Sequence, residues 1–193
     1  MQKHEHTKHP IRNAVKLKAV HSPEYLKFID AAAGPAQSSE LQTGVPASIT
    51  IAQGILESAW GKHHIGPANN YFGVKAQEDK KGTVDYGSIA TGYVDTKTRE
   101  HIGGKDKTIT DHFRSYSNMT DSFTDHGMFI KNNSRYRSAL DAYAKTGDAE
   151  EFARGLQEAH YATDPNYAET LIKIMGQRKL YQYNKTANVT AKK

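Results

Sequence analysis

The stretch Thr50–Gly61, TIAQGILESAWG, places a glutamate three positions before the only tryptophan of the chain. Apolar residues recur at steps of three and four from Ile49 to Trp60, which is the pattern of an amphipathic helix with one buried stripe. Glu57 falls at the edge of that stripe, with a small residue one turn away on each side. An interior glycine costs about 1 kcal/mol relative to alanine, so Gly54 indicates a close approach of backbone or ligand. We therefore expect this helix to form the floor of a groove.

Length and composition indicate one globular domain, because the chain has 193 residues of which 37% are hydrophobic. The absence of cysteine excludes disulfides, thiol catalysis and cysteine-based zinc sites. No apolar run is long enough to span a membrane, and the first ten residues, MQKHEHTKHP, lack the apolar segment of a signal peptide.

The net charge of +5 and the pI of about 9.2 favour polyanionic surroundings. Much of the excess lies near the two ends of the chain, and no basic stripe alternates with aromatic residues. The sequence therefore argues against a nucleic-acid-binding protein.

The chain divides into three expected parts. Residues 1–21 are polar, basic and rich in histidine, and we predict a flexible N-terminal extension. Residues 22–183 carry the periodic patterns of a folded domain, and residues 184–193 are expected to form a flexible C-terminal tail.

Helices are predicted on both sides of a glycine-rich middle segment. Ser22 is placed as the N-cap of a helix that begins at Pro23 and stops at Gly34, and a second short helix covers Pro35 to Thr43. Pro46 opens the central helix. Later helices are expected from Asn118 or Thr120 to about 131, near 135–144, from Asp148 to Ala159, and from Pro165, capped by Asp164, to about 177.

Two polar, β-branched runs surround Gly103-Gly104, which is the pattern of a hairpin with strands near 91–101 and 106–114. Helices, a hairpin and further helices describe an α+β fold in which a small β lobe is inserted between two helical halves.

Glu57 has the properties of a general acid for cleaving a glycosidic bond. Such a reaction needs a carboxylic acid that protonates the leaving oxygen, and commonly a second carboxylate. A glutamate beside Trp60 and partly removed from water has a reason to stay protonated near neutral pH, because desolvation disfavours the charged form. The hairpin offers Asp95, Glu100 and Asp106 as the second carboxylate, and spacing alone does not choose among them.

Three blocks in order resemble glycoside hydrolase family 73: ASITIAQGILESAWGKHHIGPANNYFGVKA, TREHIGGKDKTITDHFRSY and HYATDPNYAETLIKIM. This family holds bacterial and phage endo-β-N-acetylglucosaminidases related to the peptidoglycan hydrolase module of the flagellar rod-cap protein. The resemblance runs from about Ser22 to Tyr183. It implies a lysozyme-like α+β fold, mainly helical, whose β-hairpin flanks the active-site groove.

The resemblance also implies roles for single residues. Glu57 falls on the general acid of the family, although Ala59 stands where the family often has glycine. Glu100, thirteen positions before Phe113, falls on the second carboxylate and is preferred to Asp95. Tyr167 is implied in catalysis near the acid. The residues implied in substrate binding are Trp60, Asn70, Phe72, Gly73, Lys75 and Tyr161.

Several of these residues also have a purely structural interpretation. Tyr161 and Tyr167 would, without the resemblance, be assigned to packing the last helix. Glu100 would be a surface charge paired with Lys97 or Lys107. Asp121 and Asp125 on the helix after the hairpin are expected to be solvated or capping. The histidines form no metal-binding motif, so we expect no metal and no cofactor.

The expected function is that of an endo-β-N-acetylglucosaminidase that cleaves the β-1,4 bond between N-acetylglucosamine and N-acetylmuramic acid. An inverting, a retaining and a substrate-assisted route all remain open. The alternatives are a muramidase or lytic transglycosylase on the same fold, or a non-catalytic cell-wall binding module.

The expected partner is a peptidoglycan glycan strand, with neither nucleic acid nor membrane insertion, and the chain is expected to be a monomer. We expect it to act in the bacterial cell wall or periplasm and to be released by lysis, a phage tail or a dedicated secretion system. Such a route would add a delivery apparatus or an inhibitor (immunity) protein as partners.

Overall fold

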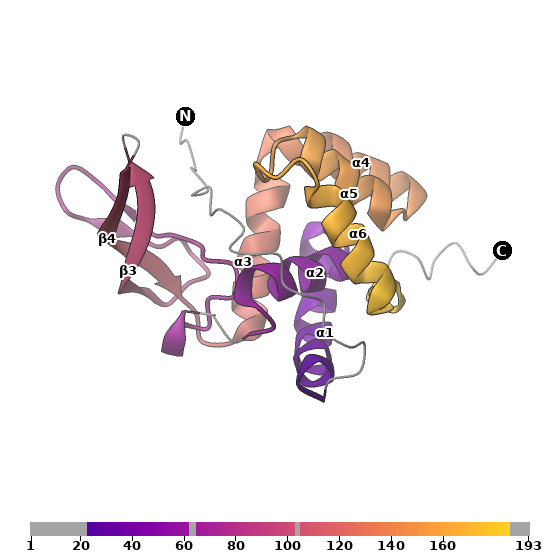
Figure 1. Cartoon of the computed structure of the whole chain (residues 1–193), viewed down its shortest axis with the longest axis horizontal. Helices are drawn as coiled ribbons and strands as arrows, with labels where there is room; N and C mark the ends of the chain where they lie inside the picture. The colour runs from indigo at the N-terminus through magenta and orange to yellow at the C-terminus, as the bar shows by residue number, and fades with distance from the viewer. Residues whose placement is uncertain (1–22, 62–64, 103–104, 186–193) are drawn as a thin grey trace.

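The computed structural model describes residues 23–61, 65–102 and 105–185 (Figure 1). Within them the chain forms six α-helices, short 3₁₀ turns and two two-stranded sheets. The helices make up one body, and the longer hairpin projects from one side of it (Figure 1). The predicted N-terminal extension, the Ser22 cap and the Gly103-Gly104 turn lie outside the described residues.

Helix α1 (Pro23–Thr43) is one continuous helix, so the predicted stop at Gly34 is wrong. Pro35 lacks an N–H group, and therefore the helix loses one internal hydrogen bond. The buried side chains of Ala32 and Ala36 hold the helix against the core on both sides of this point. The helix ends where expected, because Gly44 adopts a left-handed φ of 79°.

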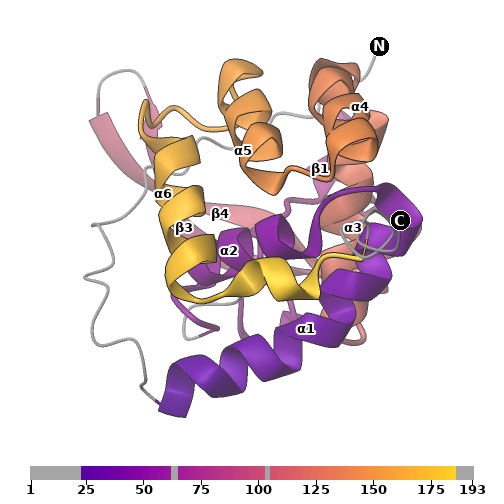
Figure 2. The same cartoon turned by 90° about the vertical axis from the view of Figure 1, so that its right-hand side faces the viewer.

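Helix α2 (Ala47–Ser58) lies at the centre of the helical body, as the view of Figure 2 shows. Every residue from Ala47 to Ile55 is buried, so most of this 12-residue helix has no solvated face. The predicted single buried stripe is therefore too narrow, and helices pack around α2 on several sides.

The helices after the hairpin confirm the predicted order. They are α3 (Met119–Asn132), α4 (Arg137–Thr146), α5 (Ala149–Glu158) and α6 (Tyr167–Gln177), with 3₁₀ turns at Ser134–Tyr136 and Leu180–Tyr183. Asn118, one of the two expected caps, caps α3, and Asp148, the expected first residue of the next helix, caps α5. The last helix begins at Tyr167 rather than Pro165, because the Asp164 carboxylate accepts a hydrogen bond from the Asn166 N–H within a turn. In the described ranges no helix has the length and apolar character of a membrane span.

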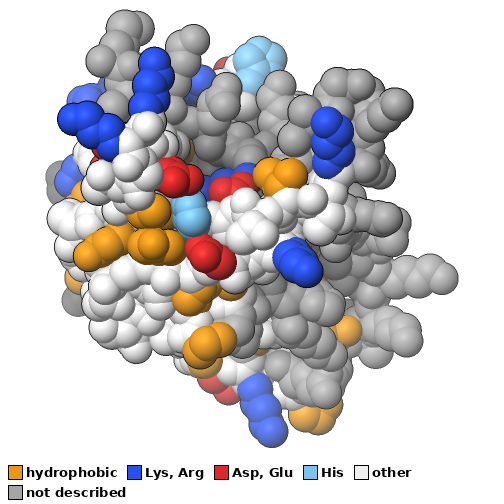
Figure 3. All heavy atoms as spheres, turned by 90° about the vertical axis from the view of Figure 1, so that its left-hand side faces the viewer, with side chains coloured by type: hydrophobic (Ala, Val, Ile, Leu, Met, Phe, Trp, Pro, Cys, Tyr) orange, Lys and Arg blue, Asp and Glu red, His pale blue; other side chains and the backbone are white. Residues whose placement is uncertain are grey.

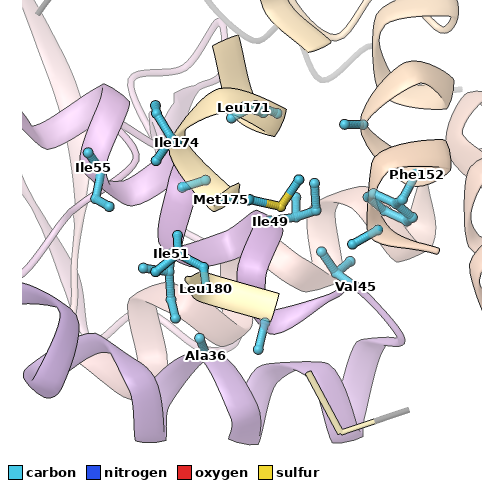
Figure 4. Close-up of a cluster of buried hydrophobic side chains, with 14 of the residues drawn as sticks. Ala36, Val45, Ile49, Ile51, Ile55, Phe152, Leu171, Ile174, Met175 and Leu180 are labelled. Carbon is cyan, nitrogen blue, oxygen red and sulfur yellow. The ribbon is translucent and has the colours of Figure 1, made fainter. Parts of the chain in front are cut away.

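The centre of the core lies between α2 and α6. Figure 4 shows Ile49, Ile51 and Ile55 of α2 among the side chains that α6 and the following 3₁₀ turn contribute. Those residues are Leu171, Ile174, Met175 and Leu180, and each is at most 2% exposed. Because burying one such side chain contributes roughly 1.5–3 kcal/mol, this contact fixes α2 firmly against the C-terminal half.

Strands β3 (Gly92–Ile102) and β4 (Lys105–Ser115) pair antiparallel, which confirms the predicted hairpin. Lys75 forms a bridge to Phe113, so the segment before the hairpin lies along β4. A second small sheet of β1 (Gln77–Glu78) and β2 (Val84–Asp85) was not predicted. It consists of two residues a strand, which is too short for a periodic pattern.

The N-terminus of α2 is capped by residues distant in sequence. Pro46 has no side-chain oxygen to offer, and the Glu40 carboxylate accepts from the Ala47 N–H at 3.1 Å. Asn184 accepts from the Ser48 N–H at 2.8 Å, and the Lys185 N–H donates to Glu40 at 3.0 Å. The chain beyond residue 183 is therefore bound to the fold through Lys185, which corrects the expected start of the C-terminal tail.

Gly54 lies against aromatic rings. A Cβ atom placed on it would lie 3.5 to 3.8 Å from ring atoms of Phe28, Phe123 and Phe72, which is ordinary van der Waals distance. The close approach inferred for Gly54 is thus ring packing in the core, and a methyl group fits there. We expect Gly54→Ala to stabilise the fold by roughly 0.5–1 kcal/mol, because alanine favours helix and restricts the unfolded chain.

Gly127 on α3 provides the matched control, measured by thermal melting alongside Gly54→Ala. A Cβ atom there would lie 2.6 Å from Ser39 Oγ, a hydroxyl that already donates to the Phe123 carbonyl. Gly127→Ala should therefore destabilise by about 1–3 kcal/mol through overpacking. A lower melting temperature for Gly54→Ala than for the wild type would contradict the packing argument.

Candidate active site

Glu57 lies in the last turn of α2, directly before an unusual chain reversal. Ala59, Trp60 and Gly61 all adopt left-handed φ angles, of 47°, 67° and 78°. The helix therefore ends at Ser58, and Trp60 does not occupy the helical position that the sequence pattern predicts. Ala59 holds a left-handed angle that glycine would adopt without strain.

Trp60 is buried rather than lining a groove. Its ring stacks on Tyr25 with centroids 4.2 Å apart. The Arg178 guanidinium lies over the Trp60 ring, 4.9 Å from its centroid. Only 7% of the residue is exposed. The structure thus places Trp60 as a support of the Glu57 turn, and direct stacking on a sugar stays a prediction for which this buried ring offers little surface.

The Glu57 side chain is open to solvent, yet protein atoms crowd around it closely enough to raise the pKa of its carboxyl to about 7 by desolvation. On a flat surface, an exposed carboxyl would be well hydrated and its pKa would not be raised by desolvation. A carboxyl on the floor of a concave site is both exposed and desolvated, because water reaches it from one side only. The raised pKa of a solvent-reaching carboxyl therefore indicates a concave setting for Glu57.

Two tyrosines lie near this carboxyl. Tyr161 and Tyr167 stack with ring centroids 5.5 Å apart and an interplanar angle of 23°. Burial raises the pKa of both phenols well above 10, and the Glu57 carboxyl adds to the shift in each case. Both hydroxyls are therefore protonated at neutral pH. Tyr161 is partly exposed, whereas Tyr167 is 1% exposed and lies behind it.

The turn between α5 and α6 presents Tyr161. His160 has a left-handed φ of 54°, and the Tyr161 N–H donates to the Leu156 carbonyl at 2.9 Å. This closes the end of α5 and directs the chain back toward α2. Tyr161 and Tyr167 thus lie within electrostatic range of Glu57, and the roles that the family resemblance implies for them stay predictions.

Gln53 and His126 belong to the same region and were not predicted. Gln53 donates to the Tyr167 hydroxyl at 2.9 Å, and its Oε1 lies 2.9 Å from His126 Nε2. Both residues are fully buried. The available signal was the position of Gln53 one helical turn before Glu57, in an otherwise apolar stretch.

The segment NNYFGVK supports the site from within. Asn70 is 1% exposed, and its amide donates to the Val74 and Arg114 carbonyls at 2.9 Å each. Phe72 is 5% exposed and stacks on His126, and Gly73 turns the chain with a φ of 62°. Lys75 is paired with Asp111. The predicted contacts of these residues with substrate are therefore not available to the buried side chains of Asn70 and Phe72.

On the hairpin, the structure describes the backbone position of Glu100 but not its side chain. Glu100 occupies a position of β3 opposite Lys107, but its side chain lies outside the described part, as does that of Asp106. The roles proposed for Glu100 accordingly stay predictions. Asp95, the alternative second carboxylate, is paired with His112.

His112 lies between two carboxylates on the outer face of the hairpin. Its Nδ1 is 2.6 Å from Asp95 and its Nε2 is 3.3 Å from Glu78. The hydrogen bond to Asp95 is the main reason that the pKa of His112 is raised. Figure 3 shows a histidine flanked by acidic side chains on this face. Asp95 thus already has a partner, which makes it less suited to act on a substrate.

Asp125 is buried and paired, so the expectation that it is solvated or capping is wrong. Its Oδ2 accepts from Arg114 Nη1 at 2.9 Å and from the Tyr116 hydroxyl at 2.6 Å. Gly87 makes room for the guanidinium, because a Cβ atom there would lie 2.7 Å from Nη1. This network joins the base of the hairpin to α3 and so sets where the hairpin stands.

Comparison with known proteins agrees with this geometry. Residues 33–180 match the sequence profile of the glucosaminidase family, described as mannosyl-glycoprotein endo-beta-N-acetylglucosaminidase. The chain is 36% identical over 157 residues to peptidoglycan hydrolase FlgJ of Vibrio parahaemolyticus, which covers 79% of this chain and 46% of that protein. It is 38% identical over 163 residues to exo-glucosaminidase LytG of Bacillus subtilis, covering 81% and 52% of the two chains. The chain therefore spans about half the length of the curated relatives it matches.

Among solved structures, a C-terminally truncated glycoside hydrolase domain of Salmonella typhimurium FlgJ superposes with a TM-score of 0.62 at 34% identity. The match covers 80% of this chain and 97% of that domain. The chain has the lysozyme-like α+β fold of these glycoside hydrolase domains. Within that fold class, the chain belongs to the glucosaminidase family, glycoside hydrolase family 73.

Proposed function

We propose that this chain is the catalytic part of a peptidoglycan hydrolase that acts in the bacterial cell wall. It is an endo-β-N-acetylglucosaminidase that cleaves the β-1,4 bond between N-acetylglucosamine and N-acetylmuramic acid. The description of the family supports an endo-acting N-acetylglucosaminidase. The names of the two relatives support peptidoglycan hydrolysis and glucosaminidase activity, although LytG is named an exo-glucosaminidase. The single observation that carries the proposal is the Glu57 side chain, which reaches solvent although desolvation by nearby protein atoms raises the pKa of its carboxyl to about 7.

Glu57 performs the acid step. A carboxyl with a pKa near 7 is protonated in about half of the molecules at pH 7, whereas an ordinary glutamate is almost wholly ionised. The proton moves to the bridging oxygen as the bond to the anomeric carbon breaks, and the sugar ring acquires positive charge. The resulting carboxylate lies near that charge and stabilises it.

The tyrosine pair forms the wall beside the acid. Tyr161 is partly exposed and offers its ring to the N-acetyl group or the sugar ring. Tyr167 stacks on it, and the Tyr167 hydroxyl accepts a hydrogen bond from Gln53 of α2 at 2.9 Å. We keep Tyr167 in the proposed catalytic set, acting beside the acid, with Tyr161 as the substrate-binding ring.

The chemistry of the products tests this proposal. Purified peptidoglycan is digested with the wild type, the products are reduced, and their reducing ends are identified by mass spectrometry. Reducing-end N-acetylglucosamine on oligosaccharides of several lengths is expected. Reducing or anhydro-N-acetylmuramic acid would show a muramidase or lytic transglycosylase instead. Wall binding without products, unchanged in Glu57→Gln, would show a non-catalytic binding module.

The second carboxylate is tested by comparing two hairpin variants. We propose Glu100 for this role, and therefore Glu100→Gln is expected to lower the rate by about 10²- to 10⁴-fold. Asp95→Asn is the matched control, because Asp95 is held by His112, and its rate should stay within a few fold of the wild type. The reverse ranking of the two variants would assign the role to Asp95.

A further inference from the structure

Four buried or half-buried side chains beneath Glu57 form a closed circuit that the acid step does not itself require. His126 Nε2 lies 2.9 Å from Gln53 Oε1, and Gln53 Nε2 donates to the Tyr167 hydroxyl at 2.9 Å. Tyr167 stacks on Tyr161, whose ring in turn meets His126 edge to face at 6.2 Å and 90°. The members come from α3, α2, α6 and the turn before α6.

The circuit includes a residue of the same helix face as the acid. Gln53 is one helical turn before Glu57 on α2, so the two side chains lie on the same side of the helix. The Gln53 amide oxygen bonds to His126 of α3, and its amide nitrogen bonds to Tyr167 of α6. The two hydrogen bonds therefore fix the side of α2 that bears Glu57 against the helix that bears Tyr167.

The hydrogen bonds also have a direction. Since Gln53 Oε1 can only accept, His126 Nε2 must carry a hydrogen and donate it. Gln53 then donates to the Tyr167 oxygen, which leaves the phenol hydrogen of Tyr167 for another acceptor. Phe72 fixes the imidazole at the far end, because the two rings are parallel within 5° at 4.0 Å.

Burial requires the polar atoms of this arrangement to form hydrogen bonds within the protein. Gln53 and His126 are fully buried and Tyr167 is 1% exposed, so each polar atom must find its partner inside the protein. Apolar side chains of the same volume would fill the space without this requirement. A polar circuit at this point is thus better explained by what it does for its neighbours than by stability.

We propose that His126 and Gln53 are positioning residues that hold the tyrosine pair against the Glu57 side of α2, and so keep the acid beside an ordered, water-poor wall. This inference rests on the proposed glycosidase function. It gives Phe72 the role of fixing the imidazole, in place of the substrate contact expected for it.

The test compares His126→Leu with His126→Gln. Leucine fills the space without a donor, whereas a glutamine amide can donate from a position close to that of Nε2. We expect kcat of His126→Leu to fall about 10- to 100-fold with KM within about twofold, and His126→Gln to recover most of the loss. Water admitted beside Glu57 should also move the alkaline limb of the pH–rate profile of His126→Leu to lower pH.

A purely structural role would lower the amount of folded enzyme without moving the alkaline limb or separating the two variants, and that result would overturn the proposal. Should His126→Leu fail to fold, the ¹⁵N spectrum of the wild-type imidazole decides: a hydrogen on Nε2 is expected, and a hydrogen on Nδ1 alone would overturn the proposal. Failure of the proposed function looks different, because the wild type itself would then release no N-acetylglucosamine ends.

Discussion

Replacing Glu57 by glutamine is expected to lower kcat on peptidoglycan by about 10²- to 10⁴-fold, because the amide cannot supply the proton that the leaving oxygen needs. The substitution changes the volume very little, so the fold should be retained. Release of soluble muropeptides measures the rate, and circular dichroism checks the fold. Activity of the variant within tenfold of the wild type would show that Glu57 is not the acid.

The same variant should be more stable than the wild type in alkaline solution. Desolvation raises the pKa of Glu57 in the folded protein to about 7, above the ordinary value of 4.5, so the folded protein keeps a proton that the unfolded chain releases. The stability due to this proton is present in acid and is lost as the pH rises from about 4.5 to about 7. Glutamine has no proton to lose.

Melting temperatures measured from pH 4 to pH 8 check this expectation. The curves of wild type and Glu57→Gln should coincide near pH 4 and separate as the pH rises, with the variant melting higher. Glu169→Gln removes an exposed carboxyl on α6 and is the matched control, for which no separation is expected. A wild type that melts higher than Glu57→Gln at pH 8 would contradict the desolvated setting of the acid.

Local signals predicted the elements of this fold well. The caps at Asn118 and Asp148 confirm where two helices begin, because a cap is a contact within one turn of the chain. The hairpin was predicted from a glycine pair between two β-branched runs, which is equally local. Family resemblance then supplied the arrangement of these elements in space.

Features set by distant contacts were missed. The continuation of α1 through Pro35 depends on burial of Ala32 and Ala36 in the core, and the pattern around a proline gives no measure of that. Gln53 and His126 are 73 positions apart, and nothing in either neighbourhood indicates their hydrogen bond. A buried polar pair is invisible to periodicity, which separates only apolar from polar positions.

The candidate site shows the same division. Glu57 could be predicted as the acid because its helix is regular up to that residue and because three blocks in order resemble one family. Trp60 could not be placed, since three consecutive left-handed residues follow Ser58 and remove it from the helical pattern. Left-handed backbone conformations of non-glycine residues cluster at functional sites, and the periodicity of apolar side chains gives no sign of them.

Removing the Asp125 carboxylate should have the largest effect on stability. Asp125→Ala leaves the Arg114 guanidinium without its counter-charge at a place where the two side chains are only 14% and 10% exposed. Breaking such a buried pair from one side costs about 3–5 kcal/mol, which lowers the melting temperature by roughly 6–20 °C for a domain of this size. Thermal melting measures it, with Asp121→Ala on the same helix as the control.

The cause can be separated from a general loss of packing. Arg114→Met combined with Asp125→Leu removes both charges, so no isolated charge remains and most of the lost stability should return. Because the pair joins β4 to α3, Asp125→Ala should also lower kcat below the wild-type value at temperatures where the variant is still folded. Equal stability of the single and the double variant would contradict the isolated-charge argument. Wild-type kcat in folded Asp125→Ala would show that the hairpin is held in place without this pair.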